Sequence, residues 1–285
     1  MVKIIDGKEE AARIREEIRI ETEELKREKR IAPGLRVILV GDDPASQAYV
    51  RNKEKASAEA GIDGQTLRYP ASITENELIS VVKKLNSDPV VDGLLVQLPL
   101  PKGMNTQKVL DAISYEKDVD GLSPLNMGKL LRGENPLFVA CTPKGIMHLI
   151  LSTGIELKGK EAVVVGRSNI VGKPMALLLL EKHATVTICH SRTKDLGEVC
   201  RRADVLVAAV GFPELIKGDM VKDGAIVIDV GTNRVDGKWV GDVEFEPASK
   251  RASFITPVPG GVGPMTIAML LENTLIAAKR RAGII

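Results

Sequence analysis

The chain is poor in the residues that build disulfide frameworks and metal sites. Of its 285 residues, only three are cysteines and three are histidines. Cys141, Cys189 and Cys200 are odd in number and far apart, so we interpret them as reduced thiols of a cytoplasmic protein. The histidines form no cluster with the spacing of metal ligands. The sequence therefore predicts neither a disulfide set nor a metal site.

Long apolar runs and an excess of either charge are also absent. No apolar run approaches the ~20 residues that a membrane helix needs. The first residues lack the apolar stretch and small-residue cleavage site of a signal peptide. Forty basic residues against thirty-eight acidic ones give a net charge of +2, so no basic stripe for nucleic acid is indicated. We expect a globular cytoplasmic protein that binds neither membranes nor nucleic acids.

Helical and strand patterns alternate along the chain, which indicates an α/β protein. Its hydrophobic fraction of 44% is enough to bury one large core or two smaller ones. In the first block, Thr74 with Glu77 three residues later has the pattern of a capping box. We expect residues 115–140 to be a loop-rich connector. The predicted helices of this block are 8–30, 46–60 and 74–86, and its strands are 35–40 and 93–100.

A second block begins with a helix at about Thr142. Its strands are near-continuous apolar runs, typical of parallel strands covered on both faces. We predict strands 162–166, 185–190, 204–211 and 225–231, a hairpin within 234–243, and a last helix from 263 to 282. The prediction is two α/β domains flanking a cleft, the second a Rossmann-like doubly wound parallel sheet. Their bounds are 1–141 and 142–267, with 268–285 packing back on the first.

The stretch VVVGRSNIVGKPM (163–175) joins a predicted strand to a predicted helix. Gly166 would allow a sharp turn, and Gly172 would let the helix lie close to the sheet. The free N–H groups at the helix start could then hold a phosphate. Ser168 stands where a dinucleotide fingerprint has its second glycine, and would hold the pyrophosphate further away or hydrogen-bond it. An ordinary tight turn between strand and helix remains the alternative.

The end of the next strand favours NADP over NAD. An NAD enzyme places a carboxylate there to bind the ribose hydroxyls, whereas this chain has CHSRT. Ser191 and Arg192 could bind the extra phosphate of NADP, and Arg167 in the loop could join them. ATP is disfavoured, because a Walker loop would need a Ser or Thr after Lys173 and the chain has Pro174.

A second group of candidate residues lies upstream, in SQAYVRNKEKASAEAG. Tyr49 and Lys53 are spaced to share one helical face whose other members are small or apolar. An unpaired ammonium on such a face would be costly to bury, so a lysine that reaches solvent at the helix edge is the alternative. A Tyr-x-x-x-Lys pair also occurs in short-chain dehydrogenases, but there it follows the nucleotide loop and here it precedes it.

Taken together, the motifs resemble those of the bifunctional methylenetetrahydrofolate dehydrogenase/cyclohydrolase family. The resemblance covers nearly the whole chain. Its seven motifs are GDDPASQAYVRNK (41–53), DGLLVQLPLP (92–101), KDVDGLSPLNMGKL (117–130), CTPKGI (141–146), GRSNIVGKP (166–174), IDVGTNR (228–234) and TPVPGGVGPMT (256–266). It implies that the first block binds folate, that the second binds NADP, and that the reaction takes place in the cleft between them. It also implies a homodimer, for which we expect pairing through the second block.

The resemblance implies roles for individual residues. Lys53 would be the catalytic lysine, Gln97 its hydrogen-bonding companion, Tyr49 the ring that packs on the folate, and Asp120 the carboxylate that holds the pterin. One carboxylate can accept the two parallel N–H donors of an aminopyrimidinone edge. The folate-binding set also includes Leu98, Pro99, Pro259, Gly260 and Gly261. The cofactor-binding set is Gly166, Arg167, Ser168, Ser191, Arg192 and Thr232, the last at a position where the family often has an apolar residue.

The implied activity is a pair of reactions in one site. NADP-dependent oxidation of 5,10-methylenetetrahydrofolate gives 5,10-methenyltetrahydrofolate, and hydrolysis then gives 10-formyltetrahydrofolate. Two alternatives stay open: a monofunctional dehydrogenase and a non-catalytic dinucleotide-binding protein. Lys53 could act as a neutral base or stay charged and polarise an oxygen. The residues alone do not choose between these.

Overall fold

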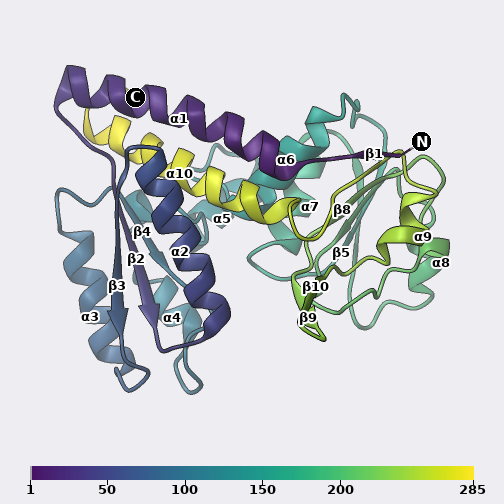
Figure 1. The fold of residues 1–285 in the computed structure, drawn as a ribbon, viewed down its shortest axis with the longest axis horizontal. Coiled ribbons are helices and arrows are strands. Elements are labelled where there is room, and N and C mark those ends of the chain that lie inside the picture. Colours follow the sequence, from purple (N-terminus) through teal and green to yellow (C-terminus); the bar gives the residue numbers. More distant parts are fainter. Residues whose placement is uncertain (1) are drawn as a thin grey trace. The chain divides into compact units, whose positions relative to one another are not determined.

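The structure is a computed structural model that describes residues 2–285. The chain forms two compact units. The six-strand unit holds residues 2–11 and Thr142–Thr266, and the three-strand unit holds Ala12–Cys141 and Ile267–Ile285. Helices α1 (Gly7–Lys29) and α10 (Val262–Arg281) each contribute residues to both units (Figure 1). Within residues 2–285, no helix is long and apolar enough to cross a membrane.

The three-strand unit is built on a parallel sheet in the order β3-β2-β4. Its strands are β2 (Gly34–Val40), β3 (Asp63–Tyr69) and β4 (Gly93–Val96). Every residue of β2 is buried because this strand lies between the other two. The helices of this unit are α2 (Pro44–Glu59), α3 (Glu75–Asn86), α4 (Thr106–Leu110) and α5 (Pro124–Leu131), with a 3₁₀ turn at Tyr115–Lys117. The capping box predicted for Thr74 and Glu77 is confirmed at the start of α3.

The structure of this unit differs from the prediction at three places. Strand β3 was not predicted, because it is a half-exposed edge strand of polar composition. The strand predicted to reach residue 100 ends at Val96, just before the segment that holds Pro99 and Pro101, which have no N–H to give to a ladder. The connector 115–140 contains helix α5, which starts at the cap Ser123 followed by Pro124, a known start signal.

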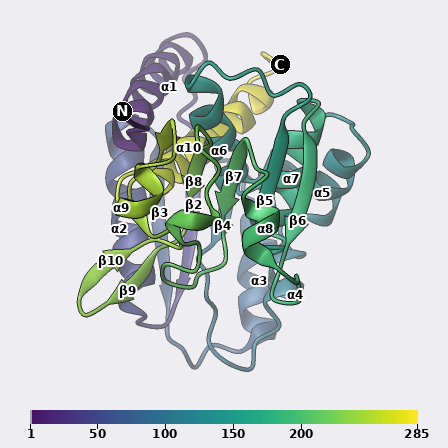
Figure 2. The same ribbon diagram turned by 90° about the vertical axis from the view of Figure 1, so that its right-hand side faces the viewer.

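The six-strand unit has a parallel sheet in the order β6-β5-β7-β8-β11-β1. Figure 2 shows β8, β7, β5 and β6 side by side. The strands are β5 (Glu161–Val165), β6 (Thr185–Cys189), β7 (Val205–Ala208), β8 (Ile226–Asp229), β11 (Phe254–Ile255) and β1 (Lys3–Ile4). The first four match the four predicted apolar runs, and the doubly wound parallel sheet is confirmed. The short strands β1 and β11 were not predicted.

The remaining elements of the six-strand unit lie around this sheet. They are α6 (Cys141–Ser152), α7 (Gly172–Glu181), α8 (Leu196–Cys200), α9 (Phe245–Ser249), a 3₁₀ turn (Gly218–Met220), and the hairpin strands β9 (Asn233–Val235) and β10 (Lys238–Val240). The predicted hairpin is confirmed, with Asp236 and Gly237 both at positive φ (49° and 80°). That conformation is what a two-residue hairpin turn of type I′ requires.

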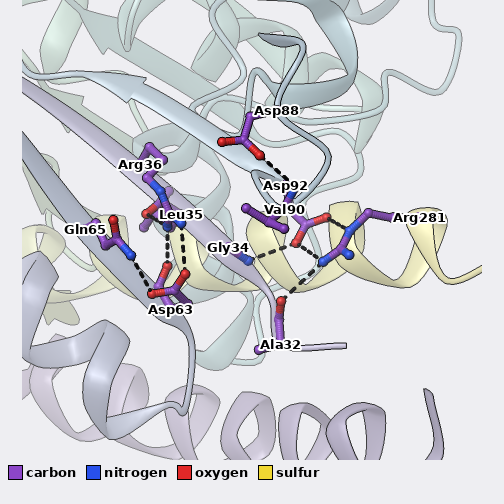
Figure 3. A network of polar contacts seen from close by, with 10 residues as sticks. All are labelled: Ala32, Gly34, Leu35, Arg36, Asp63, Gln65, Asp88, Val90, Asp92 and Arg281. Atoms are coloured by element: carbon purple, nitrogen blue, oxygen red, sulfur yellow. Dashed lines mark hydrogen bonds and ion pairs between the residues drawn. The ribbon is translucent and has the colours of Figure 1, made fainter. Parts of the chain in front are cut away.

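An ion pair between the exposed Arg281 and the buried Asp92 holds the end of α10 within the three-strand unit (Figure 3). Arg281 donates from Nε to Asp92 Oδ1 at 2.6 Å and from Nη2 to Asp92 Oδ2 at 2.9 Å. Asp92 also accepts from the Gly34 N–H at 2.8 Å. The Asp92 side chain is almost fully buried, so its charge depends on these donors.

We expect Arg281→Ala to lower the free energy of unfolding by about 1.5–3 kcal/mol, because the buried Asp92 carboxylate loses its charged hydrogen-bonding partner. Urea denaturation of the purified protein checks this. Arg280→Ala, at the exposed neighbouring position, is the control and should change stability by less than about 0.5 kcal/mol. Equal stability of the two variants would contradict the account.

Candidate active site

Lys53 lies on the buried face of α2. The Asp43 side chain caps this helix by accepting from the Ser46 N–H at 2.7 Å, and Pro44 occupies the first turn. Val50, Lys53 and Ala56 share the buried face, and Lys53 is only 7% exposed. The alternative of a lysine that reaches solvent is therefore wrong. Tyr49, one turn earlier on the helix, is half-buried.

Gln97 is the hydrogen-bonding partner of Lys53. Lys53 Nζ donates to Gln97 Oε1 at 2.9 Å. Gln97 directly follows β4, and its Nε2 donates to the Leu98 carbonyl at 2.8 Å, which orients the amide so that its oxygen faces the lysine. Leu98 is half-buried and Pro99 exposed. The carboxyl ends of parallel strands are where α/β proteins place ligands, and both predicted folate contacts lie there.

Asp120 lies half-buried on a tightly held loop after the 3₁₀ turn. Gly121 has a φ of +74°, and a Cβ there would approach the carbonyl carbon of Val139 to 2.4 Å. Asp118, which is buried, accepts from the N–H groups of Leu122 and Ser123 at 3.1 and 2.8 Å. Asn126 Nδ2 also donates to Asp118 at 2.7 Å.

Asp118 and Asn126 were missed at the sequence level. Their signal was their place beside Asp120 in KDVDGLSPLN, where an acceptor-only carboxylate can gather several loop N–H groups. Burial raises the pKa of Asp118, and these hydrogen bonds oppose the rise. The two residues fix the loop on which Asp120 lies.

Burial and mutual attraction act in opposite directions on Lys53 and Asp120. Burial lowers the pKa of Lys53, and attraction to the Asp120 carboxylate partly restores it. Burial likewise raises the pKa of Asp120, and Lys53 opposes that rise. Desolvation disfavours each charged form, so both groups move toward neutrality. A lysine in this setting can exchange a proton nearer neutral pH than an ordinary amine.

We expect Asp120→Asn to lower the pKa of Lys53 further, because the variant removes a charge that favours the ammonium form. NMR of protein with ¹⁵N-labelled lysine side chains, recorded across a pH series without folate, measures this titration. In the wild type Lys53 should titrate below the exposed lysines, and in Asp120→Asn lower still. Asp42→Asn, at an exposed position of the same unit, should leave the titration unchanged. A Lys53 signal that titrates with the exposed lysines would refute this.

The six-strand unit contains the predicted cofactor loop. Gly166 begins the loop directly after β5 with a φ of +134°, and a Cβ there would approach the Ala209 carbonyl oxygen to 2.2 Å. A Cβ on Gly172 would approach the Gly166 carbonyl oxygen to 2.2 Å. Both positions therefore exclude any side chain. Strand β5 lies between β6 and β7, where the strand order reverses, and this is the point at which doubly wound sheets bind nucleotides.

The Ser168 side chain binds backbone N–H groups at the start of the helix that follows the loop. Its Oγ accepts from the N–H groups of Val171 and Gly172 at 3.1 and 3.3 Å. The Ser168 oxygen therefore already accepts hydrogen bonds from two backbone N–H groups at the start of α7. Its O–H group can still donate a hydrogen bond. Arg167 is exposed beside it. Of the two predictions for Ser168, this arrangement favours a hydrogen bond from Ser168 to the pyrophosphate over a side chain that only holds the pyrophosphate further away.

The turn after β6 presents polar side chains without a carboxylate. The His190 N–H donates to Thr193 Oγ1 at 2.9 Å, and the Arg192 N–H donates to His190 Nδ1 at 3.1 Å. Ser191 and Arg192 are exposed on this turn. Gly166 and Gly172 let the loop pack tightly at the switch point of the sheet, where dinucleotides bind. The absence of a carboxylate from residues 190–194 fits a dinucleotide with an additional phosphate.

The other predicted site residues also lie in the six-strand unit. Thr232 is exposed after β8. Pro259 is exposed and Gly261 is buried. Gly7 packs so closely against Gly261 that a Cβ on Gly7 would lie 1.8 Å from the Gly261 carbonyl oxygen. The structure thus joins Lys53 to Gln97 directly and to Asp120 electrostatically. The cofactor set and the Pro259–Gly261 segment belong to the other unit.

A doubly wound sheet with a glycine-containing loop at its switch point is typical of a dinucleotide-binding α/β protein. In this protein a second α/β unit contains a buried lysine. Comparison with known proteins narrows this class. Residues 5–120 match the family described as tetrahydrofolate dehydrogenase/cyclohydrolase, catalytic domain, and residues 140–282 match its NAD(P)-binding domain. The chain belongs to the tetrahydrofolate dehydrogenase/cyclohydrolase family, and the resemblance drawn from the seven motifs is confirmed.

Individual relatives are similar over their full length. A bifunctional protein FolD of Moorella thermoacetica is 60% identical over 279 residues, 98% of this chain and 99% of the relative. The crystal structure of a bifunctional FolD enzyme from Campylobacter jejuni has 51% identity and a TM-score of 0.96, covering 99% of this chain and 100% of that one. A Trypanosoma brucei FolD, solved with NADP cofactor and an inhibitor, has 43% identity and a TM-score of 0.94, with 98% of each chain covered.

Proposed function

We propose that Lys53 is the acid–base centre of a bifunctional enzyme of one-carbon metabolism. The enzyme oxidises 5,10-methylenetetrahydrofolate with NADP and hydrolyses the product to 10-formyltetrahydrofolate. The observation that carries the proposal is the hydrogen bond from the buried Lys53 Nζ to Gln97 Oε1 at 2.9 Å. It occurs in a chain that is 60% identical to a bifunctional relative along nearly all of its length.

For the oxidation, the chain holds and orients two ligands. NADP, when bound, supplies the hydride acceptor. Gly166 lets the loop backbone approach the phosphates of NADP, and Ser168 and Arg167 donate hydrogen bonds to those phosphates. Ser191 and Arg192 bind the additional phosphate of NADP. We assign Thr232 to its nicotinamide half. Hydride transfer needs the two rings at near-attack distance, so these residues act by positioning.

For folate binding, we assign the pterin edge to Asp120, whose carboxylate can accept two parallel N–H donors. Tyr49 packs its ring on the folate, and Leu98 and Pro99 border it after β4. The segment Pro259–Gly261 supplies a further wall, because its glycines permit close backbone approach.

The hydrolysis requires proton transfers. A water oxygen bonds to the cationic methenyl carbon and gives up two protons. The bond from that carbon to one ring nitrogen breaks, this nitrogen gains one proton, and the other proton is released to solvent. Lys53 is the titratable side chain we assign to these transfers. Gln97 fixes its Nζ, and burial brings its pKa down toward the working range. Both a neutral base and a charged donor are compatible with this arrangement.

One assay tests the function. Purified protein with methylenetetrahydrofolate should reduce NADP, followed at the nicotinamide absorbance band, and a parallel reaction with NAD should be slower. Separate measurement of the formyl product distinguishes a monofunctional dehydrogenase, which would form NADPH without it. Tight NADPH binding with no folate-dependent absorbance change would instead indicate a non-catalytic binding protein.

We expect Arg192→Glu to raise the KM for NADP by ~10- to 100-fold and to change the KM for NAD little, since a charge-assisted hydrogen bond contributes about 1.5–3 kcal/mol. Initial rates with each dinucleotide give the comparison. Lys182→Glu makes the same charge change at an exposed position after the far end of α7 and should leave both values unaltered. A parallel loss for NADP and NAD would argue against a phosphate contact.

We further propose that the protein is a cytoplasmic homodimer that pairs through the six-strand unit. Its three cysteines are all buried, which suits a compartment that keeps thiols reduced. Sedimentation equilibrium of the purified protein tests the dimer, and a single species of monomer mass would count against it.

A further inference from the structure

Two buried aspartates of the six-strand unit, Asp229 and Asp242, have no part in the site described above. Both are nearly inaccessible, at 4% and 0% exposure. Buried carboxylates are costly unless they are hydrogen-bonded, so the groups they bind show what they hold in place. Six of the seven groups are backbone N–H groups, and four of these six lie in the loops that follow β7 and β8.

Asp242 accepts hydrogen bonds from the backbone of the turn that follows β7. Its Oδ2 accepts from the N–H groups of Val210 and Gly211 at 2.6 and 2.9 Å. Its Oδ1 accepts from the Phe212 N–H at 3.0 Å and from Asn233 Nδ2 at 2.9 Å. Three successive N–H groups thus converge on one side chain. Only an acceptor-only group such as a carboxylate can satisfy all of these donors.

Asp229, the last residue of β8, binds the segment after β10 that carries Asp242. Its Oδ1 accepts from the N–H groups of Gly231 and Asp242 at 2.9 and 2.8 Å, and its Oδ2 from the Val243 N–H at 3.0 Å. Burial raises the pKa of Asp229 to about 6, so at pH 7 it is mostly ionised and accepts only.

Two glycines make this network possible. A Cβ on Gly241 would approach Asp229 Oδ2 to 1.8 Å. A Cβ on Gly231 would approach the Asp242 backbone nitrogen to 2.3 Å. The carboxylates and the backbone they bind therefore approach each other at positions where no side chain fits.

The held loops border the switch point of the sheet. The turn Val210–Gly211–Phe212 directly follows Ala209, whose carbonyl oxygen lies against Gly166 of the cofactor loop. On the other side, Gly231 directly precedes Thr232. The two aspartates thereby connect the loop after β5, the turn after β7 and the residue assigned to the nicotinamide half.

We propose that Asp242 and Asp229 are positioning residues for NADP, fixing the backbone of two loops at the edge of its site without contacting it. The inference rests on the NADP site proposed above. A purely structural role would lower stability and leave dinucleotide affinity alone, so the two roles predict different results for a folded variant.

The test uses Asp242→Asn, whose amide places N–H groups where an acceptor is needed. NADPH affinity is measured by isothermal titration calorimetry well below the unfolding temperature, and loop order by hydrogen exchange. We expect the Kd for NADPH to rise by ~10- to 100-fold, since hydrogen bonds to a charged acceptor are stronger than those to a neutral one, with faster exchange at residues 210–212. Methenyltetrahydrofolate hydrolysis without dinucleotide should stay within twofold.

Controls separate the outcomes. Asp223→Asn, at an exposed position of the same unit, should match the wild type in every readout. A wild type that fails to bind NADPH overturns the proposed cofactor, whereas a wild type and an Asp242→Asn variant that bind equally well overturn this inference. Should Asp242→Asn not fold, Asn233→Ala, which removes one of the four donors, decides. A several-fold weaker Kd supports the inference and an unchanged Kd refutes it.

Discussion

Lys53→Met should reduce the rate of methenyltetrahydrofolate hydrolysis to below ~1/1,000 of the wild-type value, while the Kd for NADPH stays nearly unchanged. General acid–base groups contribute roughly 10²- to 10⁴-fold, and Met keeps the unbranched shape of lysine without its amine. The buried position of Lys53, bonded to Gln97, means that no neighbouring lysine on the helix can replace it. The loss of methenyl absorbance, recorded without dinucleotide, gives the rate.

Lys55→Met is the matched control, because Lys55 lies on the same helix with a side chain that is 78% exposed. It should hydrolyse the substrate at the wild-type rate. Circular dichroism and the NADPH titration show that both variants are folded. Full ring-opening activity in folded Lys53→Met would refute the assignment of the lysine.

Gly172→Ala should have the opposite pattern, with NADPH binding weakened by more than ~10-fold and hydrolysis of methenyltetrahydrofolate preserved. The added Cβ would meet three backbone atoms of the cofactor loop, the closest at 2.2 Å, so the loop itself must shift. Forcing an extra methyl into a packed site costs about 1–3 kcal/mol, which the loss of stability should reflect. Fluorescence titration with NADPH and thermal unfolding measure the two effects.

Gly197→Ala provides the control in the same unit. A Cβ at Gly197 would meet only side-chain atoms, the nearest at 3.4 Å, and Ala is the better helix former. We expect unchanged NADPH affinity there. Should Gly172→Ala bind NADPH as tightly as Gly197→Ala does, the loop between Gly166 and Gly172 would not be the phosphate-binding element.

The sequence predicted the strands that are buried on both faces, because such strands must be apolar along their whole length. β5, β7 and β8 were located in this way. β6 was located by its apolar residues, although it is an edge strand that is only partly buried. β3 was not predicted, because this edge strand is only half-buried and its sequence, DGQTLRY, has too few apolar residues to show a strand pattern. Helix α5 escaped for another reason: its cap and proline, Ser123 and Pro124, were present but its eight residues are too few for clear periodicity.

The candidate site was predictable where chemistry is carried by a motif and not where it depends on tertiary contacts. The helical spacing of Tyr49 and Lys53 was visible in the sequence, as was the loop at Gly166. The partner of Lys53, Gln97, lies on another element, and only the family resemblance suggested it. Asp118 and Asp242 bind backbone N–H groups that reach them through the fold. Every residue except proline has a backbone N–H group, so the sequence does not show which of these groups bind a carboxylate. The roles of these two aspartates could therefore not be predicted from the sequence.

The central claim is that the Lys53 amine acts at the reacting carbon of the folate. A crystal structure of the protein with a folate analogue and NADP bound tests this most directly. We predict that Lys53 Nζ, still bonded to Gln97, lies within hydrogen-bonding distance of the analogue beside its one-carbon position, with the pterin edge on Asp120. An analogue bound with its one-carbon position far from Lys53 would contradict the account.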